Sequence, residues 1–380
     1  MNQAFLLIIT KQNRIFVLHL NSKPHLSIMA TKKKQTKKSK GLSKPIKWIG
    51  SVVLAIFIYF VAIFFVPNIF PTQKEKAFLC IPDSSTFNDV TMLLSKDTKV
   101  LSMSSFKQVA GFLRYGDKIR SGRYALTAGM NNFQLIRMLR SGRQTPVRLT
   151  FNNIRTKEQL AARLGSQLMA DSTSILKLLN DTAFLTTYHL NPFTSISLFV
   201  PNTYEVFWNL NAKELFKRMD KEYDSFWTDE RKAKAAAIPL TPSQVSTLAS
   251  IVEEETNNKH DRPMVAGLYI NRLKAGMPLQ ADPTIKFAVG DFTIKRVLFG
   301  HLRTVSPYNT YKNTGLPPGP IRVATPEAID AVLNYGHHNY IYMCASETLN
   351  GEHKFAATWA EHQVNAKKYR TELNKRQIFK

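Results

Sequence analysis

The clearest structural signal in the chain is the segment Thr241-Pro-Ser-Gln-Val-Ser-Thr-Leu-Ala-Ser-Ile-Val-Glu-Glu-Glu-Thr256. A threonine followed by proline, with glutamine three positions after the threonine, is typical of a helix N-terminus. Four apolar side chains then fall on one face of the predicted helix: Val245, Leu248, Ile251 and Val252. The segment therefore predicts an amphipathic helix whose apolar stripe faces a protein core.

Glu255 continues this apolar stripe, because it follows Val252 by three residues and Ile251 by four. Glu253 and Glu254 point away from the stripe by roughly 100° or more each. A carboxylate on a core-facing stripe is costly to ionise, so burial should raise its pKa and keep it protonated near neutral pH. A protonated carboxyl is what general acid catalysis needs. The alternative is a solvated helix end at which the stripe simply stops.

Working outward toward the N-terminus, residues 48–70 contain no charged side chain. About 20 apolar residues suffice to cross the hydrocarbon core of a bilayer as a helix. Eight lysines lie between Lys32 and Lys47, and Lys and Arg accumulate on the cytoplasmic side of a span. The segment is longer than the core of a signal peptide and lacks an A-x-A-like site after it. We predict an uncleaved transmembrane helix over 48–70 and a cytoplasmic tail over 1–47.

The basic tail holds much of the chain's net charge of +25, since residues 1–70 contain eleven Lys or Arg and no Asp or Glu. The remaining charge suits a polyanionic partner or a carboxylate-bearing surface, or is an uncommitted solvated surface. Met29-Ala-Thr-Lys-Lys-Lys resembles a natural start, so we hypothesise that translation begins at Met29. Cys80 and Cys344 are too few for a disulfide framework or a zinc site, and we expect no metal and no cofactor.

The region after the predicted span divides into two parts. Residues 76–150 predict a small module of short strands and helices, with a strand over 122–126 and a helix over 133–139, and without a catalytic cluster. Residues 151–380 predict a mostly helical domain with short strands. The expected fold class is therefore α+β, with a transmembrane helix, a small βα module and a larger, mostly helical domain.

A series of motifs, in one order along the chain, resembles the YceG-like family of membrane-anchored endolytic murein transglycosylases. Leu248–Thr256 resembles the core motif of that family, and residues 122–126 with 139–142 resemble its LysM-like module. The other matching segments are Val200–Glu205, Val265–Leu273, Gly276–Thr284, Ser306–Tyr311, Gly315–Ile321 and Gly351–Phe355. The resemblance covers residues 76–375 and the anchor, and it implies that 151–380 is a catalytic domain.

The resemblance implies cleavage of the β-1,4 bond between N-acetylmuramic acid (MurNAc) and N-acetylglucosamine (GlcNAc), leaving a 1,6-anhydroMurNAc end. One acid suffices for this route, because the sugar's own C6 hydroxyl replaces water. Family analogy and the helical stripe both favour Glu255, with Glu253 as second choice. Glu254 stands where the family has Lys or Arg, so the choice among these carboxylates stays open. The implied substrate-binding residues are Asn271, Gln280, Asp282, Thr284, Tyr308, Asn309, Tyr311 and His353.

The resemblance also implies partners and a location. These are peptidoglycan glycan strands, lipid of the bacterial inner membrane and cell-wall synthases, with the catalytic domain outside the cytoplasm and a role in ending glycan elongation. One rival hypothesis is a non-catalytic, membrane-anchored cell-wall binding protein. A second is a membrane-tethered nucleic-acid binder, but the lysine block lies next to the predicted bilayer, where it suits topology and anionic lipid. We therefore expect no nucleic-acid partner.

Overall fold

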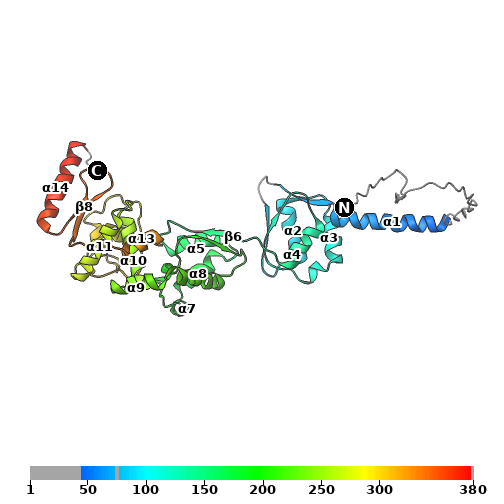
Figure 1. Cartoon of the computed structure of the whole chain (residues 1–380), viewed down its shortest axis with the longest axis horizontal. Helices are drawn as coiled ribbons and strands as arrows, with labels where there is room; N and C mark the ends of the chain where they lie inside the picture. Colours follow the sequence, from blue (N-terminus) through cyan, green and yellow to red (C-terminus); the bar gives the residue numbers. More distant parts are fainter. Residues whose placement is uncertain (1–43, 73–76, 378–380) are drawn as a thin grey trace, which may run out of the picture. The chain divides into compact units, whose positions relative to one another are not determined.

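The computed structural model describes residues 44–72 and 77–377 (Figure 1). The chain divides into two compact units at Phe57 and Ile58, within its first helix. Residues 1–43 of the predicted tail over 1–47, and the proposed start at Met29, lie outside the described residues, and residues 44–47 belong to the first helix.

Helix α1 (Lys44–Phe65) is the one described helix that is long and apolar enough to cross a membrane by itself. The apolar part runs from Pro45 to Phe65, and its most apolar stretch has a mean hydropathy of 2.5 and no buried residue. The predicted span over 48–70 is wrong at its end, because the helix stops at Phe65 and strand β1 (Pro67–Pro71) follows. Proline cannot continue a helix, and Ile69 is fully buried in the neighbouring module. That α1 spans a bilayer stays a prediction.

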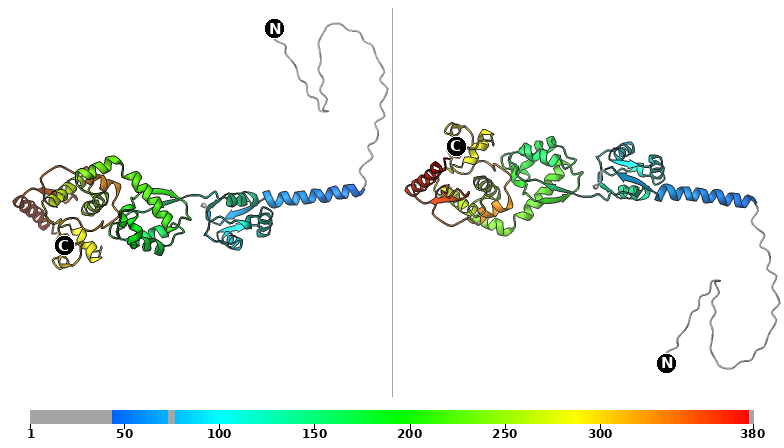
Figure 2. Two further views of the ribbon diagram at one scale, coloured as in Figure 1. Left: turned by 90° about the horizontal axis from the view of Figure 1, so that it is seen from below. Right: turned by 90° about the horizontal axis from the view of Figure 1, so that it is seen from above.

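The module after α1 contains two antiparallel sheets and is drawn in blue and cyan (Figure 2). One sheet has the order β3-β1-β5, formed by β1, β3 (Thr98–Val100) and β5 (Met130–Asn131). The other pairs β2 (Ala77–Ile81) with β4 (Gly122–Leu126), so that Ala77 faces Leu126. The helical elements are α2 (Phe87–Asp97), α3 (Met103–Phe112), η1 (Tyr115–Asp117) and α4 (Asn132–Ser141).

Local capping signals set the ends of these helices. Thr86 and Asn131 each form a capping box at the start of α2 and α4. Gly142 ends α4 in the left-handed conformation that glycine adopts without strain. The predicted strand over 122–126 is confirmed, and the predicted helix over 133–139 forms the centre of α4. The description of this module as LysM-like stays a prediction.

The next part of the chain has its own core, in which Phe151, Phe199 and Phe216 are buried together. Its two strands, β6 (Val147–Thr150) and β7 (Thr203–Val206), are antiparallel, with Val147 opposite Val206. The helices are α5 (Lys157–Gly165), α6 (Ser172–Asn180), α7 (Thr182–Thr186), η2 (Ser195–Leu198) and α8 (Ala212–Phe226).

The last part of the chain is built around helix α10 (Pro242–Glu255), which begins with the predicted Thr241–Gln244 capping box. The other elements are α9 (Asp229–Ala237), α11 (Arg262–Lys274), α12 (Asp282–Val289), η3 (His301–Arg303), α13 (Pro326–Leu333), β8 (Tyr342–Ala345), β9 (His353–Ala356) and α14 (Trp359–Lys375). Helix α10 packs against α9, α11, α12 and α13, so all nine residues from Val245 to Glu253 are buried. The buried surface of the helix is therefore wider than the predicted apolar stripe on one face. The fold class is α+β and mostly helical with short strands, as predicted.

Candidate active site

Glu255 is the last residue of α10, where the helix leaves the core. The side chain is partly accessible, but its Oε2 atom is shielded from solvent and has no hydrogen-bond partner among the described residues. Burial raises the pKa of Glu255 to about 7, and the charge of Asp282 adds to the rise. The Tyr269 hydroxyl and the cations Lys286 and Arg272 oppose it. Glu255 therefore keeps its proton over much of the neutral range.

Tyr269, in α11, is the second buried polar group at this place. Its side chain is 1% exposed, and its hydroxyl has no hydrogen-bond partner among the described residues. Its hydroxyl lowers the pKa of Glu255 as a hydrogen-bonding neighbour would. Buried polar atoms are nearly always hydrogen-bonded, so we read Tyr269 and Glu255 as one buried polar pair. Sequence reasoning missed Tyr269, although a phenol among the apolar residues of segment 265–273 was a usable signal.

Arg272 orders the loop before α12 and was also missed. It is 8% exposed and donates hydrogen bonds to four groups. These are the carbonyl oxygens of Ile341 at 2.7 Å, Leu279 at 2.8 Å and Pro278 at 3.3 Å, and Gln280 Oε1 at 3.2 Å. A buried guanidinium that binds carbonyl groups fixes the course of a loop because its donors have a rigid geometry. Arg272 thus holds residues 278–280 directly before Asp282.

Asp282, Tyr311 and Gln280 are predicted site residues that the structure brings close to this loop. Asp282 is the first residue of α12 and is exposed, and its Oδ1 accepts a hydrogen bond of 2.6 Å from the Tyr311 hydroxyl. Gln280 is exposed, has a positive φ of 53°, and its backbone N–H donates to the Thr310 carbonyl at 3.0 Å. These three residues remain candidates for substrate contact.

Three predicted substrate-binding residues form hydrogen bonds within the fold. Thr284 and Asn309 are fully buried. The Thr284 hydroxyl bonds to the Ala281 carbonyl at 2.7 Å, and the Asn309 amide donates to the Leu302 and Thr304 carbonyls at 3.0 and 2.8 Å. The Asn271 amide donates to the His338 and Tyr340 carbonyls at 2.7 and 3.0 Å. Internal carbonyl groups accept hydrogen bonds from all three side chains, and their role in substrate binding stays a prediction.

Tyr308 and His353 also have structural partners. The Tyr308 ring packs on Phe287 with centroids 4.6 Å apart, and burial raises its pKa to about 12. His353 Nδ1 lies 3.0 Å from Asp261 Oδ2, and its backbone N–H donates to the same oxygen at 2.8 Å. His353 therefore ties β9 to the start of α11.

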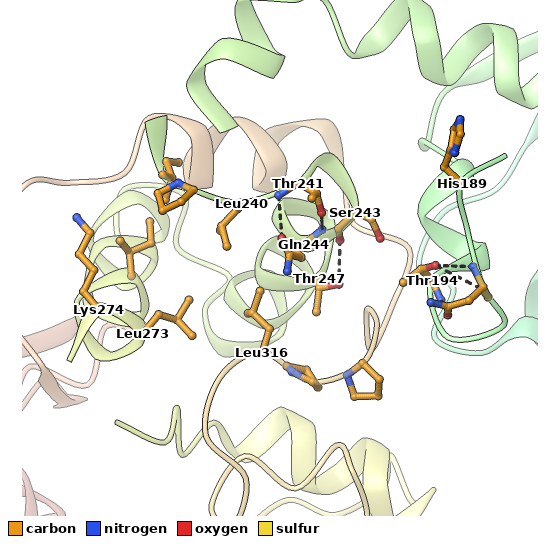
Figure 3. A pocket seen from close by; sticks show the side chains of 16 residues that line it. His189, Thr194, Leu240, Thr241, Ser243, Gln244, Thr247, Leu273, Lys274 and Leu316 are labelled. Atoms are coloured by element: carbon orange, nitrogen blue, oxygen red, sulfur yellow. Dashed lines mark hydrogen bonds between the residues drawn. The ribbon is translucent and has the colours of Figure 1, made fainter. Parts of the chain in front are cut away.

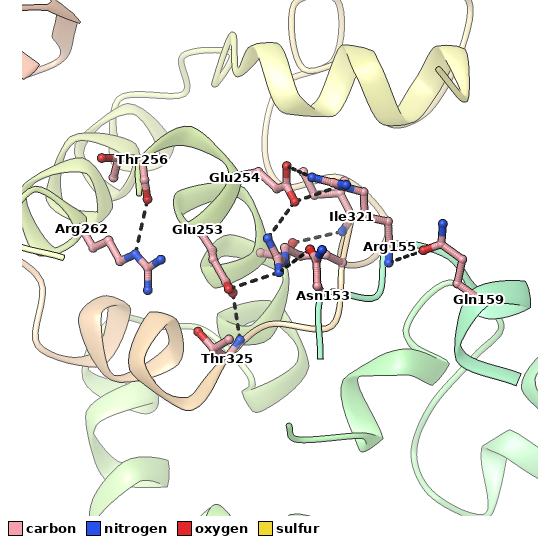
Figure 4. A network of polar contacts seen from close by, with 11 residues as sticks. Asn153, Arg155, Gln159, Glu253, Glu254, Thr256, Arg262, Ile321 and Thr325 are labelled. Atoms are coloured by element: carbon pink, nitrogen blue, oxygen red, sulfur yellow. Dashed lines mark hydrogen bonds and ion pairs between the residues drawn. The ribbon is translucent and has the colours of Figure 1, made fainter. Parts of the chain in front are cut away.

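Glu253 and Glu254 differ from Glu255 because both are ion-paired (Figure 4). Glu254 accepts two hydrogen bonds of 3.0 Å from Arg155 and one of 2.8 Å from Arg322. Glu253 is 6% exposed; it lies 3.4 Å from Arg322 and accepts a hydrogen bond of 2.9 Å from the Thr325 N–H. Of three consecutive carboxyl groups, Glu255 is the one without an ion pair or hydrogen bond to either arginine.

A separate cavity of about 680 Å³ opens beside the N-terminal half of α10 (Figure 3). Thr241, Ser243 and Gln244 line it together with Pro317 and Pro318. None of the described residues around this cavity is Asp or Glu. Glu255 is at the opposite end of the helix and does not line the cavity. The cavity therefore lacks the carboxyl group that acid catalysis on a glycosidic bond needs.

The fold and this site define a class: an α+β protein whose candidate acid–base centre is one buried carboxyl at the end of a core helix. Among the described residues, no group of His, Cys, Asp and Glu could hold a metal ion. The YceG-like family model matches residues 79–368, more than half of the chain. The chain belongs to the YceG-like family.

Curated relatives and a solved structure are similar to this chain over most of its length. The endolytic murein transglycosylase of Bacillus subtilis is 29% identical over 322 residues, which are 80% of this chain and 88% of that protein. The endolytic murein transglycosylase of Streptococcus pneumoniae D39 is 26% identical over 77% of this chain, which spans only 58% of that longer protein. A crystal structure of a YceG-like protein from Listeria monocytogenes matches 77% of this chain with a TM-score of 0.52, at 26% identity.

Proposed function

We propose that this protein is an endolytic murein transglycosylase in which Glu255 is the catalytic acid. One observation carries the proposal: a carboxyl oxygen at the end of the core helix is shielded from solvent, forms no ion pair among the described residues, and belongs to a group with a pKa of about 7. The names of the relatives from B. subtilis and S. pneumoniae support the same activity.

The proposed reaction breaks the C1–O bond between MurNAc and GlcNAc. Protonated Glu255 donates its proton to the glycosidic oxygen, which leaves on GlcNAc. The resulting carboxylate accepts the proton of the MurNAc C6 hydroxyl, whose oxygen forms a new bond to C1. The products are a 1,6-anhydroMurNAc end and a free GlcNAc 4-hydroxyl, and no water is consumed. One group thus serves as acid and then as base, so the two-carboxylate arrangement of hydrolases is not required.

Neighbouring residues support this chemistry by charge and by position. The negative charge of Asp282 favours the protonated form of Glu255 before the reaction. The same charge stabilises positive charge that develops on the sugar ring as the bond breaks. We assign Tyr269 to positioning Glu255, because its buried hydroxyl acts on that carboxyl and lowers its pKa. Gln280 and Tyr311 are exposed or half-buried beside Asp282 and are candidates for sugar hydroxyls.

We further propose that α1 anchors the protein in the bacterial cytoplasmic membrane, with the N-terminus in the cytoplasm. The support is one apolar helix of sufficient length after a lysine-rich tail. The catalytic domain then works on nascent glycan strands outside the cytoplasm and ends their elongation, beside cell-wall synthases. The module over 76–150 is proposed to be LysM-like.

The test is digestion of purified, uncrosslinked glycan followed by mass analysis of the chain ends. Glu255→Gln keeps the shape of the side chain but removes the acidic proton, so activity should fall by about 100-fold or more. Glu254→Gln is the matched control on the next residue and should retain most activity. Full activity of Glu255→Gln would overturn the assignment. Loss of activity in Glu253→Gln with an unchanged melting temperature would move the role to Glu253.

The same digestion distinguishes the enzyme from a non-catalytic wall-binding protein. A binding protein would retain glycan on a column but release no 1,6-anhydro ends, even from the unsubstituted chain. Products with a reducing MurNAc end would instead indicate a hydrolase and contradict the proposed role of the C6 hydroxyl.

A further inference from the structure

The end of helix α1 is packed against the module that follows it, rather than joined to it by a free linker. The rings of Phe60 and Phe64 contact Phe112 of α3, with centroids 6.2 and 5.5 Å apart. The Tyr59 hydroxyl donates a hydrogen bond of 2.6 Å to Gln108 Oε1, also in α3. Tyr59 lies six residues before the helix ends, so α3 reaches back along α1 by about 9 Å.

Two buried asparagines fix the same junction. Asn132 donates to the Ile63 carbonyl at 2.8 Å, which is one of the last carbonyls of α1 and has no partner within the helix. Asn68 donates to Asn132 Oδ1 at 2.7 Å and accepts a hydrogen bond of 2.7 Å from the Ser102 N–H. These bonds satisfy the helix end internally, so the orientation of α3 against α1 is determined by the fold.

Large apolar side chains remain exposed around this junction. Phe112 is 68% exposed and Leu101 is 58% exposed, and the Leu101 N–H donates to the Asn68 carbonyl at 2.9 Å beside the helix end. Phe65 and Val66 are also exposed. We call these four residues the junction surface. Exposed apolar residues that cluster in this way mark a surface that something covers.

We infer that the junction surface lies at the boundary between the hydrocarbon core and the lipid headgroups of the bilayer, so that the module is partly embedded in the membrane. The inference rests on the proposed membrane anchor. The apolar part of α1 has 21 residues and a length of about 31 Å, close to the thickness of a hydrocarbon core. Tyr59 and Phe60 then lie below the outer boundary of that core, and the α3 side chains that contact them lie at the same depth.

The chemistry of this surface fits a lipid partner. The Tyr59–Gln108 hydrogen bond pairs two polar groups that would otherwise be costly at that depth. Tyrosine is typical of the membrane interface. Lys107 and Arg114 are exposed on and just after α3, where they suit anionic headgroups. A bilayer therefore accounts for the apolar and the basic side chains together.

The experiment places an environment-sensitive fluorophore on single cysteines of the full chain, with Cys80 and Cys344 replaced by serine. The protein is reconstituted in vesicles of phosphatidylcholine and phosphatidylglycerol that contain nitroxide-labelled lipid. Leu101→Cys tests the junction surface without removing an aromatic contact. Val53→Cys, in the apolar part of α1, tests whether the anchor is in the bilayer. Glu230→Cys, at an exposed position of α9, is the aqueous control.

We expect the label at residue 101 to emit further to the blue than the label at 230 and to lose most of its intensity to nitroxide placed near the headgroups. Quenching at 53 without quenching at 101 would overturn the inference while the anchor stands. Absence of quenching at both positions would overturn the anchor and this inference with it, and would leave the proposed glycan chemistry untouched.

Discussion

Glu255 has to carry a proton to act as an acid, so the rate should follow its protonation. Burial raises its pKa to about 7, which means that the protonated form dominates below that pH. We expect kcat/KM to be level on the acidic side of about 7 and to fall about tenfold per pH unit on the alkaline side. A pH profile on purified glycan measures this. A rate that still rises at pH 9 would contradict the role of Glu255.

Two charged residues near Glu255 should move this profile in opposite directions. Asp282 raises the pKa of Glu255 and Lys286 lowers it. The alkaline limb should therefore shift to lower pH in Asp282→Asn and to higher pH in Lys286→Gln. The two variants control for each other, because each removes one charge at the start or middle of α12. Shifts in the same direction would mean that charge does not govern the titration.

The raised pKa of Glu255 also has a cost in stability, which gives a measurement independent of activity. The folded chain holds this proton more tightly than the unfolded chain, so stability falls as pH rises from about 4.5 to about 7. Replacement by glutamine removes a penalty of about 3 kcal/mol at pH 8 and none at pH 4. Thermal unfolding at the two pH values should show Glu255→Gln as more stable only at pH 8. Equal stability at both would indicate a solvated side chain.

At the scale of elements, the C-terminal end of α10 carries three carboxylates that oppose the helix dipole. Arg322 offsets this unfavourable arrangement, because its 11% exposed side chain lies 2.8 Å from Glu254 and 3.4 Å from Glu253. Arg155 pairs with Glu254 from the segment before α5. The two arginines come from segments far apart in sequence, so they connect two distant segments to the helix end.

Removal of Arg322 should therefore destabilise the protein more than removal of Arg155. Arg322→Met leaves the buried Glu253 without its ion-pair partner and Glu254 with Arg155 alone, and we expect a loss of about 3–5 kcal/mol. Arg155→Met is the matched control; its side chain is 31% exposed, so its loss should be about 1 kcal/mol. Urea unfolding of the full chain in detergent measures both. Equal losses would show that burial of Arg322 has no energetic consequence.

Local signals predicted the elements well, and contacts between distant segments account for the failures. The capping box at Thr241 and the glycine after α4 act within a few residues, so the sequence displays them directly. The apolar composition of residues 67–70 predicts membrane helix, whereas these residues form strand β1. The partners of β1, β3 and β5, lie about 30 and 60 residues further along the chain. Composition alone cannot reveal such pairing.

In the candidate site, too, local spacing predicted correctly and contacts between distant segments were missed. The position of Glu255 followed from helical periodicity, which depends only on spacing within α10. Thr284 is in the first turn of α12 and Asn309 is in a loop, and in both places the burial of the side chain depends on the segments packed around it. Tyr269 and Arg272 gain their importance from groups on other segments, namely Glu255 and the Leu279 carbonyl. No local pattern marks such contacts.

At the scale of the whole molecule, charge and apolar length together predict which side of the membrane each part occupies. Residues 1–47 contain all eleven Lys or Arg of the N-terminal 70 residues. The apolar part of α1 begins at Pro45, between the last two of these lysines. Such a distribution favours a cytoplasmic N-terminus. The opposite orientation would put the candidate site in the cytoplasm, away from the glycan that the proposed reaction needs.

A membrane-impermeant thiol reagent can test this topology in a bacterial host whose outer barrier is absent or permeabilised. With Cys80 and Cys344 replaced by serine, Glu230→Cys should react in intact cells, because residue 230 is exposed in the predicted outer part. Lys34→Cys should react only after lysis, since the lysine block stays inside. The two variants have matched chemistry and differ only in their side of the helix. Reaction of Lys34→Cys in intact cells, with Glu230→Cys protected, would reverse the orientation and exclude a role on extracytoplasmic glycan.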